Sequence, residues 1–166
     1  MVCSNAIAES LRLSDWLPYR MFIVATRVAR PLESLYGERF GLSQAGWRVL
    51  AVIAERDGVS ASEIGRACGL DPFAVSRAIA QLVDLGFAFR GTGKTDRRMA
   101  AVAITDEGRA AFGEIARLAL ELEARLLATL SGAERAALDR ALTKLDRESA
   151  LFESLPWHRI LDEPES

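Results

Sequence analysis

The chain has 166 residues, half of them apolar, which is enough for the hydrophobic core of one compact domain and leaves no room for a separate catalytic domain. Its formal net charge is −2 and its pI is about 5.6, so the overall balance of charged residues does not indicate a nucleic-acid-binding protein. The local balance differs, because five basic residues and two acidic residues lie between Arg77 and Arg98.

Two cysteines, Cys3 and Cys68, are too few for a disulfide framework, and residues 1–10 lack the basic cluster and long apolar run of a secretory signal. No uninterrupted apolar segment approaches the roughly 20 residues that a membrane-spanning helix needs. We therefore expect a cytoplasmic protein with no membrane partner.

Residues 1–13 carry little pattern, and we expect a flexible leader there. A long amphipathic helix follows, with Ser14 and Asp15 as its cap and apolar residues in steps of three and four up to Leu35. Pro31 interrupts this helix, because proline removes one backbone hydrogen bond and clashes with the preceding turn at a cost of about 3 kcal/mol. The sequence therefore predicts a kink or a break near residues 27–30.

A second helix begins after Ser43 and ends before Gly58. Its predicted core stripe, with Trp47 beside it, consists of Ala45, Val49, Val52 and Ile53. We expect this helix to brace the two helices that follow.

Residues 60–86 carry the start and stop signals of two short helices in close succession. Ser60 and Glu63 form a capping box, and Asp71 followed by Pro72 marks a second helix start. The turn through Gly69 is so short that the two helices must cross sharply, as in a helix-turn-helix. The buried stripe of the second helix is predicted to be Val75, Ala78, Ile79, Leu82 and Leu85. Its exposed face is predicted to hold Phe73, Ser76, Arg77, Ala80, Gln81 and Asp84.

After Gly86 the pattern changes from helical to alternating. Phe87 and Phe89 should point one way, with Ala88 and Arg90 pointing the other, and a return strand carries Ala100, Val102 and Ile104. The turn between the strands holds two glycines and no large apolar residue, so it must project. Its charged residues, Lys94, Asp96, Arg97 and Arg98, have an excess of positive charge that suits a polyanion. The order of parts is that of a winged helix-turn-helix.

Thr105 caps another long helix, whose apolar residues form more than one stripe and therefore need two packing partners. Ser131 and Glu134 form a capping box for a further helix. We expect a mainly α chain with a small β wing, in which a winged helix-turn-helix (41–104) is flanked by long dimerisation helices (14–40 and 105–152). The tail, 153–166, either packs on the partner subunit or frays.

Three runs of sequence resemble the MarR family of bacterial transcription regulators, named for multiple antibiotic resistance. They are LSQAGWRVLAVIAERDG (42–58), SASEIGRACGLDPFAVSRAIAQLVDLGFAFR (60–90) and TDRRMAAVAITDEGRA (95–110). The resemblance covers about residues 15–150, and its most specific part is Asp96-Arg97-Arg98 followed by the closing strand, Thr105 and Gly108. It implies a homodimer with intertwined end helices that binds a pseudo-palindromic DNA operator, represses a neighbouring gene and is released by a small molecule.

On this interpretation, helix 71–85 enters the major groove of the DNA. There Gln81 can pair with adenine and Arg77 with guanine, and each good bidentate contact contributes about 1–3 kcal/mol of discrimination between bases. Ser76 suits a phosphate or a shared base contact. This chain has Phe73 and Ala74 where the family usually has small polar residues, and Phe73 either meets thymine methyl groups or packs against the preceding helix.

The resemblance also assigns roles in the wing and in regulation. Arg98 would read the minor groove, oriented by Asp96, while Arg97 and Lys94 would contact phosphates. A small aromatic or phenolic effector would bind between the dimer helices and the DNA-reading part. The aromatic residues that could line its site, or belong simply to the core, are Trp16, Tyr19, Phe22 and Trp47.

Other classes of function find less support in the residues. The two rivals are a winged-helix protein-interaction module without DNA binding and a thiol redox sensor. Cys68 sits where a small buried residue is wanted, and Cys3 has no basic neighbour to lower its pKa. The chain has one histidine, His158, and two scattered cysteines, which are too few for a metal site. A lone histidine in the tail does not make a catalytic triad either, so we expect no metal, no cofactor and no enzymatic activity.

Overall fold

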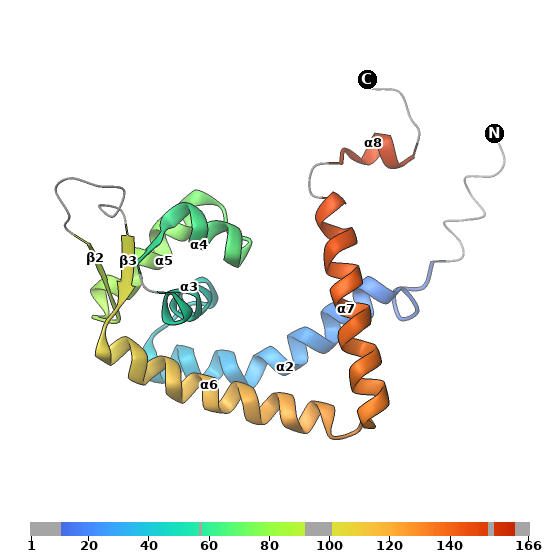
Figure 1. Cartoon of the computed structure of the whole chain (residues 1–166), viewed down its shortest axis with the longest axis horizontal. Coiled ribbons are helices and arrows are strands. Elements are labelled where there is room, and N and C mark those ends of the chain that lie inside the picture. The colour runs from blue at the N-terminus through green and yellow to red at the C-terminus, as the bar shows by residue number, and fades with distance from the viewer. Residues whose placement is uncertain (1–10, 57, 92–100, 153–154, 162–166) are drawn as a thin grey trace. The chain divides into compact units, whose positions relative to one another are not determined.

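The computed structural model describes residues 11–56, 58–91, 101–152 and 155–161 (Figure 1). The chain is mainly α with a small antiparallel sheet, as predicted. Its elements in order are α2 (Leu17–Phe40), α3 (Gln44–Glu55), β1 (Val59–Ser60), α4 (Ala61–Cys68), α5 (Pro72–Asp84), β2 (Ala88–Arg90), β3 (Ala101–Ile104), α6 (Asp106–Leu127), α7 (Gly132–Phe152) and α8 (Trp157–Ile160). Contacts divide the chain into two compact units, and the boundary falls within α6, after Leu122.

The first long helix, α2, begins later than the sequence predicted and is continuous past its proline. It begins after Trp16, with Pro18 in its first turn, so the prediction of a cap at Ser14 and Asp15 is wrong. It also continues through Pro31 to Phe40, so of the predicted kink or break near residues 27–30 the break does not occur. The turn that follows Pro31 packs Leu32, Leu35 and Tyr36 against the core, which offsets the cost of the proline.

The predicted caps of the next three helices are confirmed. The Ser43 hydroxyl accepts a hydrogen bond from the Gly46 amide, and Ser60 and Glu63 form a reciprocal capping box. The Asp71 carboxylate accepts from the amides of Phe73 and Ala74, both at 2.9 Å. Gly69 ends α4 with φ of 62°, a left-handed conformation that favours glycine. Together these signals confirm a sharp turn between α4 and α5.

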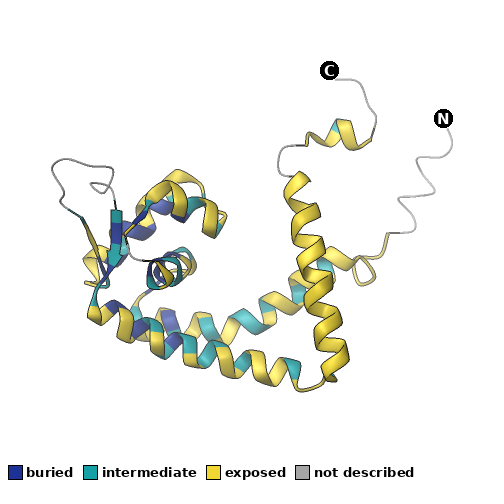
Figure 2. Cartoon of the chain, viewed as in Figure 1, coloured by how far each residue is buried: buried dark blue, intermediate teal, exposed yellow. Residues whose placement is uncertain are grey.

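The core of the first unit lies where α3, α4, α5 and the sheet meet (Figure 2). Val75, Ala78, Ile79 and Leu82 of α5 are buried as predicted, whereas Leu85 is 39% exposed because the helix ends at Asp84. The largest fully buried side chains are Leu50, Ile53, Ile64, Ile79, Leu82 and Ile115. Leu50 was not part of the predicted stripe of α3.

Three strands among the described residues form one antiparallel sheet in the order β1-β3-β2. The register pairs Val59 with Val102 in β1 and β3, and Ala88 with Ile104 in β2 and β3. Ala88 is buried and Phe89 is exposed, which confirms the predicted alternation over these two residues. Because β1 is two residues long, its own sequence carries no strand pattern, and the sequence analysis missed it.

The start of α6 is tied to the turn before the wing strands. The Thr105 hydroxyl accepts from the Gly108 amide at 2.9 Å and donates to the Gly86 carbonyl at 2.7 Å, which confirms the predicted cap. Further along, the Arg39 guanidinium lies 2.7 Å from the Glu114 carboxylate and joins α2 to α6. The anchored end of α6 therefore contributes to the core, through Ala111 and Ile115.

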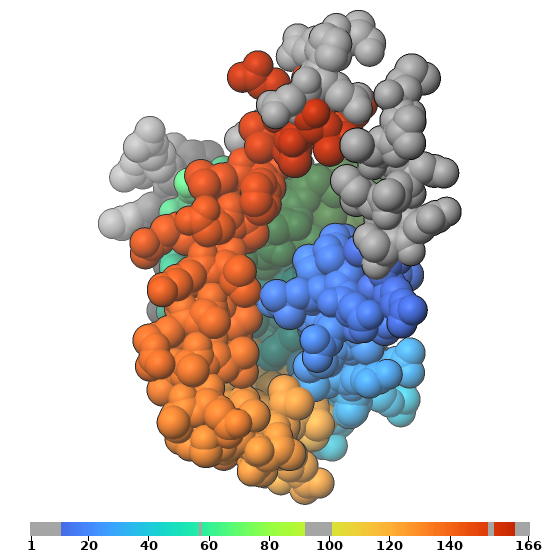
Figure 3. Space-filling model, turned by 90° about the vertical axis from the view of Figure 1, so that its right-hand side faces the viewer, coloured from blue at the N-terminus to red at the C-terminus, as the bar shows by residue number. Residues whose placement is uncertain are grey.

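The second unit is built differently, because every residue of α7 is exposed (yellow in Figure 2). The predicted capping box at Ser131 and Glu134 is confirmed at its start. Figure 3 draws α7 in orange, and none of its residues is buried. No helix in the described ranges is both long and apolar enough to cross a membrane.

Candidate nucleic-acid interface

The outer face of α5 is an exposed surface of the helix-turn-helix. Asp71 caps this helix and Pro72 occupies its first turn, so its N-terminal end is firmly defined. The opposite stripe, which includes Val75 and Ile79, is buried. Burial on one side fixes the rotation of α5 about its axis and leaves Phe73, Ser76 and Arg77 in solvent.

Phe73 and Arg77 form a pair on that face. The Phe73 side chain is 71% exposed, so it does not pack against the preceding helix, which was one of the two predicted alternatives. Instead, the guanidinium carbon of Arg77 lies 5.7 Å from the centre of the Phe73 ring, within the range of a cation–π interaction. The face therefore presents an apolar ring and a cation side by side.

Gln81, predicted to pair with a base, uses its amide within the protein. Its Oε1 accepts from the Ser43 hydroxyl at 2.8 Å and from the Ser43 amide at 3.2 Å, and its Nε2 donates to the Gly41 carbonyl at 3.0 Å. In this conformation the amide is not free for a bidentate contact with adenine. Sequence reasoning missed this arrangement because the partners lie 38 and 40 residues away along the chain.

Beside these groups the surface is hollowed. A hollow of about 300 Å³ lies between the start of α3 and the outer face of α5, and it is lined by Ser43, Ala45, Ala74, Arg77, Ala78 and Gln81. The Arg77 side chain therefore borders both the exposed face and a recess next to it.

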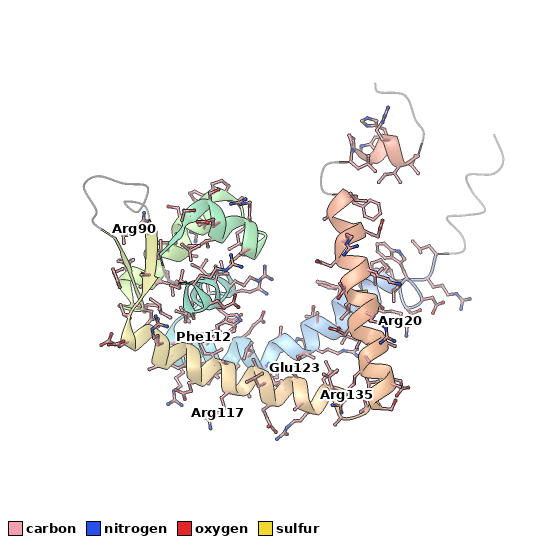
Figure 4. The ribbon with its side chains drawn as sticks, viewed as in Figure 1. Arg20, Arg90, Phe112, Arg117, Glu123 and Arg135 are labelled. Atoms are coloured by element: carbon pink, nitrogen blue, oxygen red, sulfur yellow. The ribbon has the colours of Figure 1, made fainter. Side chains whose placement is uncertain are left out.

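The predicted wing is described only at its base. β2 ends at Arg90, labelled in Figure 4, where it pairs with Val102 of β3. The Gly91 amide donates to the Ala101 carbonyl at 2.8 Å and closes the ladder. The charged residues of the turn, Lys94, Asp96, Arg97 and Arg98, lie outside the described residues. Their roles stay predictions.

Comparison with known proteins places the chain in a family. The sequence profile described as the MarR family matches residues 40–99, the stretch from the end of α2 into the wing. A putative transcriptional regulatory protein for the hcr operon of Thauera aromatica is 30% identical over 110 residues, which is 66% of each chain. The crystal structure of a MarR-family transcriptional regulator from Silicibacter pomeroyi superposes with a TM-score of 0.69 at 26% identity, covering 81% of this chain and 90% of that one.

The chain belongs to the MarR family of transcription regulators. A third relative, the HTH-type transcriptional repressor Rv2887 of Mycobacterium tuberculosis, is 26% identical over 129 residues, 78% of this chain and 92% of that protein. These relatives are transcription regulators and not enzymes, and membership of the family implies DNA binding.

The four aromatic residues predicted to line an effector site do not come together in this MarR-family chain. Trp47 stacks on Tyr36 and on Phe112, at centroid distances of 6.2 and 5.8 Å, and packs against the core (Phe112 is labelled in Figure 4). Trp16, just before α2, and Phe22, in its second turn, are exposed, and the ring centroid of Tyr19 lies 6.4 Å from that of Phe22. Phe22 lies 14 residues before Tyr36, the residue on which Trp47 stacks, and 14 residues of one helix span about 21 Å. The aromatic residues at the start of α2 are therefore far from Trp47.

Cys68, the cysteine within the described residues, does not support a redox site. Cys68 is half-buried at the end of α4, and burial raises the pKa of its thiol although Arg48 lowers it. Since the thiolate is the reactive form, a raised pKa makes Cys68 less reactive toward oxidants. Cys3 lies outside the described residues. Within those residues, no cluster of three histidine, cysteine or carboxylate side chains could hold a metal ion.

Proposed function

We propose that the protein is a homodimeric transcriptional repressor that binds a pseudo-palindromic operator and is released by a small aromatic molecule. The observation that carries the DNA-binding part is the outer face of α5, where Phe73, Ser76 and Arg77 are exposed while the opposite face is buried. A helix held in this way can enter the major groove with its side chains directed at base edges.

The chemistry of the three side chains suggests their partners. The Arg77 guanidinium can donate two parallel hydrogen bonds to guanine, and the neighbouring Phe73 ring can contact the methyl group of thymine. Ser76 suits a phosphate oxygen. Gln81 has no base-reading role in this proposal, because its amide is already bonded to Gly41 and Ser43.

The wing would extend the interface into the minor groove. β2 and β3 lead directly into the turn that holds Lys94, Asp96, Arg97 and Arg98. A narrow minor groove concentrates negative potential and attracts arginine, so we assign Arg98 to the groove with Asp96 orienting it. Arg97 and Lys94 would contact phosphates, and each such contact steepens the salt dependence of binding.

Dimerisation is supported by apolar residues that the single chain leaves in water. Leu138, Leu142 and Leu145 of α7 are each more than 40% exposed, and so are Leu17 and Phe22 of α2. We assign residues 14–40 and 105–152 to the dimerisation region and 41–104 to the DNA-binding region. Two copies of α5 would then meet half-sites about 34–36 Å apart, one turn of the duplex.

The proposed repression of a gene and the proposed release from DNA by an effector rest on observations outside the outer face of α5. The mycobacterial relative is a repressor, which supports the same role here. For the effector we retain Trp16, Tyr19 and Phe22, which lie together at the start of α2, with Trp16 and Phe22 exposed. We exclude Trp47 because its ring packs against the core.

The test is the selection of bound duplexes from a random pool with the full chain. We expect a two-fold symmetric motif, and we expect Arg77→Ala to relax the preference at one base pair in each half-site. Arg98→Ala should weaken binding to all duplexes strongly. An unsymmetrical pool, or attraction to duplexes no greater than to heparin, would contradict the proposal and favour a protein-interaction module.

A further inference from the structure

We propose that Gln81 is a positioning residue, which fixes the recognition helix α5 on the junction between α2 and α3 and does not read a base. The inference rests on the proposed function, in which α5 enters the major groove. It concerns the hydrogen bonds of Gln81 to Gly41 and Ser43, called here the Gln81 bridge.

Both partners in the Gln81 bridge are groups at helix ends. Gly41 ends α2 with φ of 65°, and Ser43 is the N-cap of α3. Backbone groups at helix ends have no partner within their own helix, so they are available to a side chain. One amide therefore connects the end of α2, the start of α3 and the third turn of α5.

The bridge depends on the absence of a side chain at Gly46. A Cβ built at Gly46 would lie 2.5 Å from Gln81 Oε1 and 3.2 Å from the Ser43 hydroxyl oxygen. The Gly46 amide itself donates to that hydroxyl, at 3.0 Å. Gly46 thus keeps open the space that the Gln81 amide occupies.

The junction that the bridge holds is itself fixed in the core. Leu42, between the two bonded residues, is only 4% exposed, and its amide donates to the Tyr36 carbonyl at 3.0 Å. Gln81 is therefore bonded to a rigid part of the chain, and the bond restrains α5 with respect to α2.

The direction of the reading side chains follows from this restraint. Arg77 lies one turn before Gln81 and lines the same hollow. Because side chains extend about 5–6 Å from the helix axis, a rotation of α5 by about 20° moves the ends of Phe73 and Arg77 by about 2 Å, which is enough to misalign a hydrogen bond. Loss of the bridge should therefore weaken every base contact of α5 together.

The experiment compares Gln81→Leu, Gly46→Ala and the double variant in the full-length protein. Gln81→Leu removes the amide but keeps the side-chain volume, whereas Gly46→Ala displaces the amide without removing it. We measure the affinity for the selected duplex and for its single-base-pair variants at one salt concentration, together with the melting temperature.

Each single variant should lose roughly tenfold in affinity, equally for all duplexes, with an unchanged order of base preferences. The double variant should be no worse than either single variant, because both changes break the same bridge. The salt dependence should not change, since no phosphate contact is lost.

Three results would overturn the inference. A loss confined to one base pair in Gln81→Leu would make Gln81 a base reader, and wild-type affinity in Gly46→Ala would show that the bridge does not matter for binding. A lower melting temperature with unchanged affinity of the folded protein would give Gln81 a role in stability alone. By contrast, failure of the wild-type chain itself to prefer any duplex would refute the proposed function, and the inference with it.

Discussion

On α5, the Phe73 ring and the Arg77 guanidinium favour one another although both are in solvent. A cation–π contact at an exposed site contributes about 0.5–1 kcal/mol, which is less than the roughly 2 kcal/mol of rotamer entropy that an arginine side chain holds. The ring therefore biases Arg77 toward some rotamers without immobilising it. In the proposed interface, such a bias would reduce the entropy that is lost when the guanidinium is ordered on DNA.

This pair predicts a change in binding without a large change in stability. In Phe73→Ala the free energy of unfolding should fall by less than about 1 kcal/mol, because the ring is 71% exposed. Operator affinity should fall several-fold, since the apolar contact and the bias on Arg77 are both lost. Phe73→Tyr is the matched control, because it keeps the ring, and it should bind like the wild type. Urea unfolding and fluorescence anisotropy with a labelled duplex make the two measurements, and equal binding by both variants would refute the role of the ring.

Residues whose partners are near in sequence were predictable, and those with distant partners were not. Asp71 bonds to amides two and three residues ahead, so its cap could be read from the sequence. Gln81 lies on the face that helical periodicity assigns to solvent, yet its partners are about 40 residues away. Periodicity gives the direction of a side chain, and only the fold shows what it meets there.

At the scale of elements, the contact between α6 and β2 depends on a glycine. A Cβ at Gly108 would lie 2.1 Å from the Phe87 carbonyl oxygen and 2.8 Å from Ile104 Cγ1. At Gly108 the first turn of α6 thus lies so close to the backbone of Phe87, just before β2, that no side chain fits between them. Thr105 holds the turn in place from the other side, through its bond to Gly86.

We therefore expect Gly108→Ala to destabilise the fold by about 1–3 kcal/mol, because backbone has to move to admit the methyl group. Gly113→Ala in the same helix is the control, since a Cβ at Gly113 would meet no atom outside the helix backbone within 4 Å. It should stabilise the protein by about 0.5–1 kcal/mol, the usual gain of alanine over glycine within a helix. Urea midpoints of the two variants should move in opposite directions, and a shift of both in the same direction would contradict this interpretation of the contact.

Elements with their own local signals were predicted well, whereas those that depend on tertiary contacts were not. A kink or a break near residues 27–30 was expected from the local cost of Pro31 alone, but Leu32, Leu35 and Tyr36 pack on the core and α2 has no break. β1 exists because Val59 pairs with Val102, more than 40 residues later.

At the scale of the whole molecule, the exposed apolar residues of α7 need a partner that a single chain does not provide within its described residues. Leu138, Leu142 and Leu145 follow one another in steps of four and three, so they lie on one face of the helix. Each is between 41% and 43% exposed. Burial of apolar surface drives most protein association, and a second copy of the chain would supply an equivalent apolar face.

Replacing the central leucine should separate the proposed dimer. In Leu142→Glu a charge enters the apolar face, so we expect this variant to sediment at the mass of one chain and the wild type to sediment at the mass of two. Operator binding should weaken by orders of magnitude, because one subunit contacts a single half-site, while the helix-turn-helix stays folded by circular dichroism. Arg140→Glu changes an exposed residue on the other side of α7 and should leave both mass and binding unchanged. A wild-type monomer, or a Leu142→Glu variant that remains dimeric and binds DNA normally, would exclude this face of α7 from the dimer interface.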